Sequence, residues 1–134
     1  QSQFGVPAAR LGIAYGFDGL RRLVSLVSPA MANEIMFTAN RINADDALRI
    51  GLINRVIPGD EIESTVRDLA MTIANNAPLS VNASKVTIKE VLKDSGDRDM
   101  DNLAKISKAC FDSADYAEGR QSFMEKRQPV FTGT

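Results

Sequence analysis

Histidine is absent from this 134-residue sequence, and cysteine occurs only once, as Cys110. Without imidazole, neither a Ser-His-Asp nor a Cys-His catalytic arrangement can form, and no histidine-based zinc site is possible. A single thiol cannot form an intrachain disulfide, so nothing indicates an oxidising compartment. Cys110 stands beside Phe111 in a helical pattern, where a plain core role is the favoured interpretation and a reactive nucleophile the alternative.

The sequence also lacks an excess of charge and a long apolar run. Sixteen Lys+Arg stand against 17 Asp+Glu, giving a net charge of -1, so no basic excess is present to hold nucleic acid through its phosphates. The apolar runs are a few residues long, whereas about 20 are needed to span a bilayer, and the first residues do not resemble a signal peptide. These features predict a cytoplasmic or organellar-matrix protein without a nucleic-acid or membrane partner.

The residues that are present predict a folded, mainly α protein. Hydrophobic residues make up 44% and charged residues 25% of the sequence, as in ordinary globular domains. Apolar residues recur at helical spacing in six or seven segments, and little of the sequence has strand character. Helix starts are indicated by Ser28 followed by Pro29, and by Asn43, Pro78 and Ser113.

One of these segments carries a regular apolar stripe, at Ile62, Val66, Leu69 and Ile73. The spacing i, i+4, i+7, i+11 predicts an amphipathic helix. The tail over 128–134 contains proline and polar residues, so we expect it to be extended or frayed.

Two blocks resemble the enoyl-CoA hydratase/isomerase (crotonase) family. The first, residues 41–58, reads RINADDALRIGLINRVIP, in which a short alanine-rich helix ends at Gly-Leu and enters an extended stretch. The second comprises Glu-Gly-Arg at 118–120 and FMEKRQPVF at 123–131. With Phe-Gly at 4–5 and Leu-Gly at 11–12 in register, the resemblance covers nearly the whole chain.

The resemblance implies the C-terminal helical region of the α/β crotonase (ClpP/crotonase-type) fold. In that fold a repeated β-β-α spiral core precedes a helical region. Residues 1–58 would then be the end of the spiral-core region, with the turn of the acyl pocket and short helices. Residues 59–134 would be the C-terminal helical region that builds the trimer.

The implied function is that of a CoA-thioester enzyme, an enoyl-CoA hydratase (a lyase) or isomerase that works through a thioester enolate. Its substrate would be an acyl-CoA or enoyl-CoA, with coenzyme A as part of the substrate and no covalently bound cofactor or metal. Family members stabilise the enolate with two backbone N–H groups from the half of the fold before this region, so we expect these 134 residues alone to be inactive.

The implied catalytic residue is missing, because Ala8 stands where hydratases carry a glutamate that moves protons. Some relatives place an acid at the position of Gly16, and Asp18, two residues later, is a weak candidate for that role; a solvated turn acid is the other interpretation. The resemblance implies substrate contacts from Tyr15, Gly16 and Lys126, and the lysine would meet a phosphate of coenzyme A. Ser107 replaces an aromatic residue of some hydratases, which speaks against adenine stacking.

Several alternatives remain open. Ala8 leaves a decarboxylase, a hydrolase or an inactive relative as possible parents. A different class is a non-catalytic helical oligomerisation module, because the C-terminal helices of the family also build a homo-oligomer, a trimer or a hexamer. The acyl-chain length and the pathway cannot be read from these residues.

Overall fold

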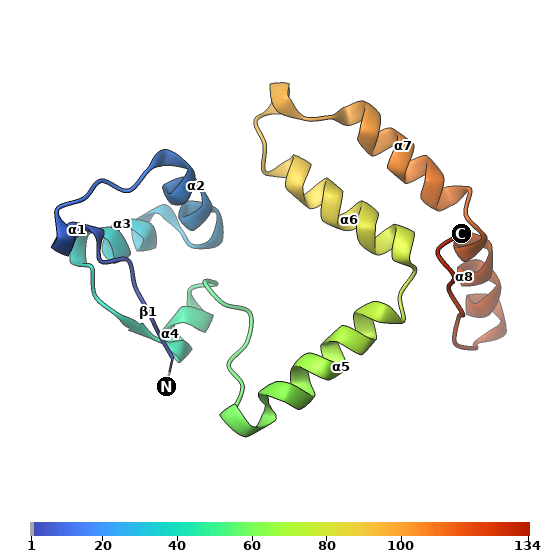
Figure 1. Ribbon diagram of the computed structural model, residues 1–134, viewed down its shortest axis with the longest axis horizontal. Coiled ribbons are helices and arrows are strands. Elements are labelled where there is room, and N and C mark those ends of the chain that lie inside the picture. Colours follow the sequence, from blue (N-terminus) through green and yellow to red (C-terminus); the bar gives the residue numbers. More distant parts are fainter. Residues whose placement is uncertain (1) are drawn as a thin grey trace. The chain divides into compact units, whose positions relative to one another are not determined.

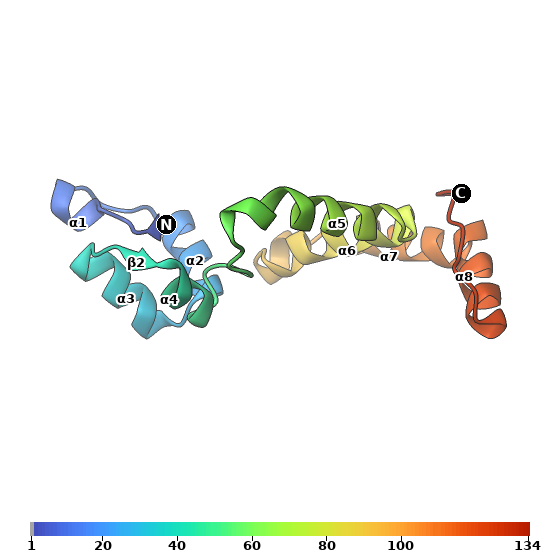
Figure 2. The same cartoon turned by 90° about the horizontal axis from the view of Figure 1, so that it is seen from below.

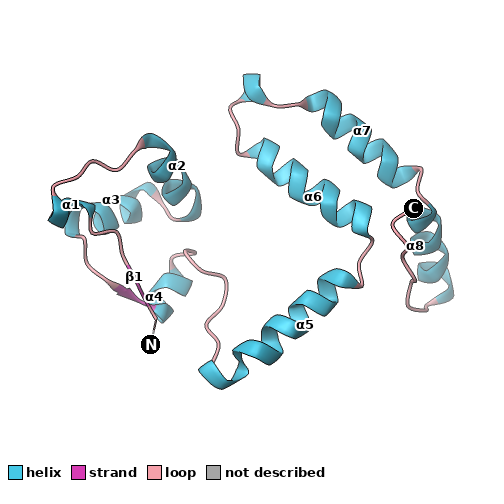
Figure 3. Cartoon of the chain, in the orientation of Figure 1, coloured by secondary structure: helices cyan, strands magenta, loops and turns pink. Residues whose placement is uncertain are grey.

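The computed structural model describes residues 2–134. Its contacts divide the chain into two compact units, Gln1–Asp60 and Glu61–Thr134. The described residues form eight α-helices and one two-stranded sheet (Figure 3). The mainly α architecture with little strand is therefore confirmed, and the chain has one short helix, at Ala8–Leu11, beyond the six or seven expected.

The first unit combines a small sheet with short helices (Figure 1). Its elements are β1 (Gln3–Phe4), α1 (Ala8–Leu11), α2 (Phe17–Leu26), α3 (Pro29–Thr38), β2 (Ile42–Asn43) and α4 (Ala44–Arg49). β1 pairs antiparallel with β2, with Gln3 opposite Asn43 and Phe4 opposite Ile42. Both α1 and α2 pack against α3, and α4 packs against the strands.

A small core fixes the corner between α2 and α3. Val27, Ala32 and Ile35 are buried there. Partly buried apolar residues surround them: Val6, Leu23, Met31, Ile42, Ile50 and Leu52. This core holds the C-terminal end of α2 against α3.

The predicted caps define the starts of α3 and α4. The Ser28 Oγ accepts a hydrogen bond of 3.2 Å from the N–H of Met31, and Pro29 is the first residue of α3. The Asn43 Oδ1 accepts one of 2.8 Å from the N–H of Asp46. Each bond satisfies a backbone donor that the helix itself leaves without a partner.

The second unit contains four longer helices. They are α5 (Ile62–Ala74), α6 (Pro78–Val91), α7 (Met100–Phe111) and α8 (Ala114–Glu125), with a short 3-10 turn at Ser95–Asp97; another 3-10 turn, Gly59–Glu61, spans the boundary between the two units in the sequence. α6 and α7 lie side by side as a hairpin, and α7 also contacts α8 (Figure 1). The helix predicted from the apolar stripe is confirmed as α5. Its stripe is exposed, however, because the side chains of Ile62, Val66, Leu69 and Ile73 keep 42–56% of their accessible surface.

Buried charge holds the α6–α7 hairpin together. The Glu90 carboxylate accepts a hydrogen bond of 2.7 Å from the Lys93 Nζ and one of 2.9 Å from the backbone N–H of Asp99. Arg98 donates from Nε to the carbonyl oxygen of Lys93 at 3.2 Å. The hydrogen bond from Lys93 and that from the Asp99 N–H lower the pKa of Glu90. The carboxylate thus joins the end of α6 to the start of α7.

The C-terminal tail returns along α8 (Figure 2). Asp115 is buried and accepts hydrogen bonds of 2.7 and 2.9 Å from the backbone N–H groups of Thr132 and Gly133. The N–H of Ala114 donates to the carbonyl oxygen of Thr134 at 2.7 Å. The tail is therefore extended, as expected, but the alternative of a frayed tail was wrong: a buried carboxylate binds its backbone.

Candidate functional site

The turn that leads into α2 brings together three of the residues predicted from the sequence. Gly16 is the N-cap of α2 in an extended conformation, and Tyr15 comes directly before it. Asp18 lies in the first helical turn, where a carboxylate favours the positive end of the helix dipole. Gly16 offers no side-chain oxygen to cap the helix, so the turn is shaped by backbone and by the tyrosine ring.

The Tyr15 ring lies across the first turn of α2. An added Cβ at Gly19 would come within 2.6 Å of Cε1, 3.1 Å of Cδ1 and 3.4 Å of Cζ of that ring. The tyrosine still keeps 43% of its surface accessible. One edge of the ring therefore packs on the glycine, and the remainder is open to a ligand or to another part of a larger protein.

Position 8 is occupied by a buried methyl group rather than by an acid. Ala8 is the first residue of α1 and is 3% exposed. α1 is followed by Gly12 in the left-handed region, with φ of 65°, and the Arg10 Nη2 donates to the Asn40 Oδ1 at 2.8 Å. No proton transfer can start from the alanine. Asp18 lies on the exposed side of α2, and in this unit alone nothing holds it as a catalytic group.

Lys126 lies in the second unit, at the elbow between α8 and the tail. It is the C-cap of α8 and adopts the left-handed conformation, with φ of 54° and ψ of 40°. Its side chain is exposed. The backbone N–H donates to the carbonyl oxygen of Phe123 at 3.3 Å. Tyr15, Gly16 and Asp18 belong to the first unit, where the structure groups them, and Lys126 belongs to the second unit.

An ion-pair network fixes the backbone on both sides of Lys126. The Arg127 Nη1 and Nη2 donate to the two carboxylate oxygens of Glu118 at 2.6 and 2.8 Å. The Arg127 Nε donates to the Glu125 Oε2 at 2.6 Å, and the Val130 N–H donates to Glu118 at 2.9 Å. The Arg127 guanidinium, followed by the Val130 N–H, lowers the pKa of Glu118 to about 2. A bidentate pair of this kind orders the elbow that presents the lysine.

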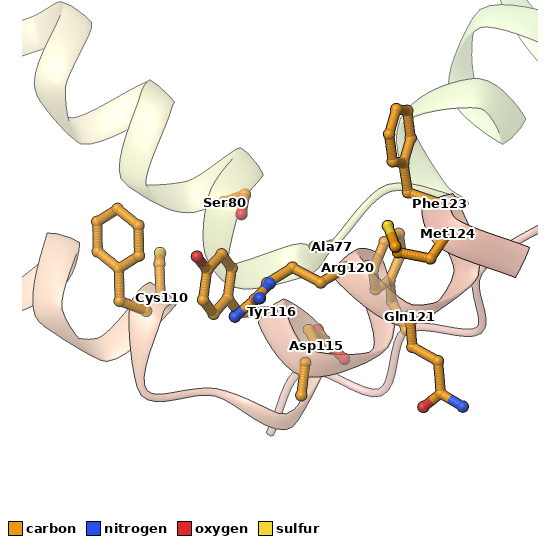
Figure 4. A pocket seen from close by; sticks show the side chains of 13 residues that line it. Ala77, Ser80, Cys110, Asp115, Tyr116, Arg120, Gln121, Phe123 and Met124 are labelled. Atoms are coloured by element: carbon orange, nitrogen blue, oxygen red, sulfur yellow. The ribbon is translucent and has the colours of Figure 1, made fainter.

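Sequence reasoning missed an apolar cleft of about 880 Å³ in the second unit (Figure 4). Its walls come from α7, α8 and the start of α6, and they include Phe111, Tyr116, Phe123 and Met124. Phe111 meets Tyr116 edge to face, with ring centroids 5.3 Å apart. The Arg120 guanidinium carbon lies 5.8 Å from the centroid of the Tyr116 ring, a cation–π distance.

Three of the cleft residues are not covered by the rest of their unit. Phe123 is 84% exposed and Met124 is 81% exposed. Cys110, expected in a core, is only partly buried and lines the cleft. The spacing of Tyr116 and Arg120, one helical turn apart, was a usable signal for the cation–π pair, but nothing local to the sequence distinguishes a cleft wall from a core face.

The structure of residues 2–134 also bears on metal ions and membranes. Within that range, no cluster of three or more acidic or cysteine side chains could hold a metal ion. Of the helices described there, none combines the length and apolar character that crossing a bilayer requires.

The known proteins that this chain resembles in sequence carry closely related descriptions. A family model described as enoyl-CoA hydratase/isomerase matches residues 1–134. A crotonyl-CoA hydratase from Syntrophomonas wolfei is 40% identical over 130 residues, which make up 97% of this chain and 50% of that protein. A short-chain-enoyl-CoA hydratase from Clostridium acetobutylicum is 38% identical over 127 residues, or 95% of this chain and 49% of that protein.

The fold of the chain is also similar to solved structures of proteins with such descriptions. The crystal structure of an enoyl-CoA hydratase from Mycobacterium tuberculosis matches with a TM-score of 0.82 at 36% identity, covering 99% of this chain and 53% of that chain. The chain spans about half the length of the curated relatives it matches.

Proposed function

Because the chain belongs to the enoyl-CoA hydratase/isomerase family, we propose that it is the C-terminal portion of a crotonase-type enzyme acting on CoA thioesters. The proposed reaction is hydration of an enoyl-CoA, or the related isomerisation, through a thioester enolate. The observation that carries this proposal is the family match over residues 1–134. Two hydratases that are 40% and 38% identical to the chain support it. Coenzyme A enters as part of the substrate, in the cytoplasm.

Tyr15 and Gly16 are the proposed acyl-chain contacts. Both lie in the exposed turn before α2, and the ring of Tyr15 offers an apolar surface with a polar tip. Gly16 has no side chain, so an acyl group could approach the backbone there. Asp18 is the carboxylate nearest in sequence to this turn and is retained only as a weak catalytic candidate.

Lys126 is the proposed contact for a phosphate of coenzyme A. An ammonium group meets phosphate as a point charge, and the exposed side chain at the ordered elbow is free to extend toward it. In the full-length protein, Lys126→Met should weaken binding of butyryl-CoA but not of a short thioester that lacks the nucleotide. An equal effect on both ligands would contradict a phosphate contact.

The isolated 134-residue chain should not catalyse the reaction. Family members bind the thioester oxygen with two backbone N–H donors from the half of the fold that precedes this region. Donors of that kind contribute about 2.7–4 kcal/mol each to transition-state stabilisation. The test is hydration of crotonyl-CoA by the isolated chain and by the full-length protein. Turnover by the isolated chain would contradict the proposed dependence on those donors.

Ala8 is the reason to keep a second reaction under consideration. The alanine methyl is buried where a hydratase glutamate is expected, which leaves a decarboxylase, a hydrolase or an inactive relative open beside the proposed hydratase. In the full-length protein, Ala8→Glu should raise hydration by about 100-fold to 10,000-fold if position 8 is the acid/base position. No gain in a folded variant would contradict that assignment.

The alternative of a non-catalytic oligomerisation module rests on the exposed apolar side chains of α7 and α8. Phe111, Phe123 and Met124 are 62%, 84% and 81% exposed, and helices of this region would build a homotrimer or a hexamer. The two functions differ in a direct test on the full-length protein. An enzyme binds acyl-CoA and converts enoyl-CoA, whereas a module forms the oligomer and does neither.

A further inference from the structure

Gly19 occupies a position where the backbone does not require glycine. It lies in the first turn of α2, within the helix Phe17–Leu26. The glycines with a positive φ are Gly12, Gly51 and Gly133, so Gly19 is not among them. A glycine inside a helix lowers helix stability relative to alanine. Some other contact must therefore account for the missing side chain.

The contact is the ring of Tyr15. Among the nine glycines, all of them in the described part of the chain, only Gly19 would place a Cβ closer than 3.0 Å to another atom. The nearest atom is Cε1 of Tyr15, at 2.6 Å. Real Cβ atoms do not approach a ring so closely, so Tyr15 could not keep its present position above an alanine.

This arrangement resembles a hydrophobic staple, in which the residue before the N-cap packs on the fourth residue of the helix, but here the contact is with the third residue, Gly19. Tyr15 immediately precedes the N-cap Gly16, the position from which an apolar side chain ordinarily folds back on the first turn and fixes the direction of the entering chain. Here the ring packs on the glycine itself. The position of the ring and the course of the turn are therefore coupled through Gly19.

We propose that Gly19 is a positioning residue, which holds the Tyr15 ring against α2 so that its free side forms a wall for the acyl chain of the CoA thioester. This inference rests on the proposed function for its ligand. Because the space between Gly19 and the ring is too small for a methyl group, the ring can keep this position only while residue 19 is glycine. Tyr15 touches the substrate, and Gly19 acts only through Tyr15.

The ring can move without unfolding the protein. Tyr15 is half-exposed, while the core of its unit is built from Val27, which ends α2, and from Ala32 and Ile35 of α3. Gly19→Ala should leave that core intact and improve the intrinsic helix propensity of α2. Its effect should therefore be a displaced ring in a folded protein, with thermal stability at or above that of the wild type.

The first measurement follows the ring by NMR in the 134-residue chain. The wild type should show nuclear Overhauser contacts between the Tyr15 ring protons and the Gly19 α protons. In Gly19→Ala the Tyr15 ring shifts should change, while those of Tyr116, the other tyrosine of the sequence, should not. Absence of the ring contact in the wild type would overturn the inference.

The second measurement is a double-mutant cycle with butyryl-CoA in the full-length protein. Gly19→Ala should weaken binding by about threefold to tenfold, the range expected for one lost aromatic contact. In a Tyr15→Ala background the same change should have no further effect, because the ring is already gone. Gly96→Ala is the matched control, since an added Cβ there meets nothing within 4 Å.

The outcomes separate the inference from the proposed function. If wild type and Gly19→Ala bind butyryl-CoA equally, the positioning role is wrong and the proposed function stands. An additive effect in the Tyr15→Ala background also overturns the role, because Gly19 would then act by another route. If the full-length wild type does not bind butyryl-CoA, the proposed function is wrong and the inference falls with it.

Discussion

Asp115 is a buried anchor for the C-terminal tail on α8. Asp115 is 3% exposed, and its carboxylate accepts hydrogen bonds from the N–H groups of Thr132 and Gly133. Hydrogen bonds to a charged acceptor are stronger than neutral ones, and buried donors left without a partner are costly. The end of the tail is thus bound by a carboxylate that lies 17 and 18 residues before its partners.

Asp115→Ala should lower the free energy of unfolding by about 2 kcal/mol, since two backbone donors lose a charged acceptor. Urea denaturation measures the loss, and hydrogen exchange at Thr132 and Gly133 reports release of the tail. Asp112→Ala is the control, because Asp112 makes only an exposed pair with Lys108 and such pairs contribute little. Equal losses in the two variants would contradict the role of Asp115.

Glu118 should make the elbow at Lys126 sensitive to acid. Its pKa is lowered from 4.5 to about 2 by the Arg127 guanidinium and then the Val130 N–H. A folded-state pKa below the unfolded value means that the stabilisation is complete above pH 4.5 and is lost as the pH falls toward 2. Hydrogen exchange at Val130, followed over that range, measures the change.

The variant Glu118→Gln should remove most of this pH dependence while keeping an acceptor for the Val130 N–H. Glu63→Gln is the comparison, because Glu63 pairs with Arg67 on the surface and surface pairs are worth little. A wild type whose Val130 exchange does not change between these pH values would exclude the ion pair as the anchor.

Among the elements, helix starts were the part of the fold most accessible from the sequence. Ser28, Asn43 and Ser113 each accept the hydrogen bond that a capping residue is expected to accept. Such bonds span three residues, so their partners can be identified from local spacing. The same is true of α5, whose period was visible as an apolar stripe.

What could not be predicted depends on residues far apart in the sequence. The binding of the tail to Asp115 joins residues 17 and 18 apart and has no local signature. The cleft wall at Phe123 has the same apolar spacing as a core face, because periodicity identifies the apolar side of a helix but not what covers it. The contact between Tyr15 and Gly19 was also missed, although both residues were visible within one turn.

The α6–α7 hairpin should depend on Glu90 more than on its own helix propensities. The carboxylate bridges Lys93 and the N–H of Asp99 at the turn. Glu90→Ala should lower the melting temperature and increase hydrogen exchange at Asp99, since the Lys93 ammonium and the Asp99 N–H lose their charged acceptor. Glu61→Ala, at an exposed position, is the control. An unchanged Asp99 exchange rate in Glu90→Ala would show that the turn is held elsewhere.

Large apolar side chains are exposed in both units of the molecule. Those on α8 are the most exposed: Phe123 at 84% and Met124 at 81%. The chain also spans about half the length of its curated relatives. Exposed apolar patches favour association, so we expect the isolated chain to form oligomers in solution.

Light scattering tests that expectation directly. The double variant Phe123→Ser with Met124→Ser should shift the isolated chain toward smaller species, because each change removes apolar surface from the same helix. Gln121→Ser on that helix should leave the distribution unchanged, since Gln121 is polar and is hydrogen-bonded to Glu125. A wild-type chain that is monomeric at all concentrations would contradict the expectation.

At Lys126 the left-handed backbone conformation lowers the stability of the fold, whereas the lysine side chain is the proposed contact for coenzyme A. A lysine with φ of 54° is disfavoured by about 1 kcal/mol compared with glycine, which adopts this region freely. Lys126→Gly should therefore raise the melting temperature of the isolated chain. If the ammonium binds phosphate, the same variant should bind coenzyme A more weakly in the full-length protein. Directed evolution for heat resistance alone would then select glycine at this position, and evolution for turnover at scarce substrate would restore the cation.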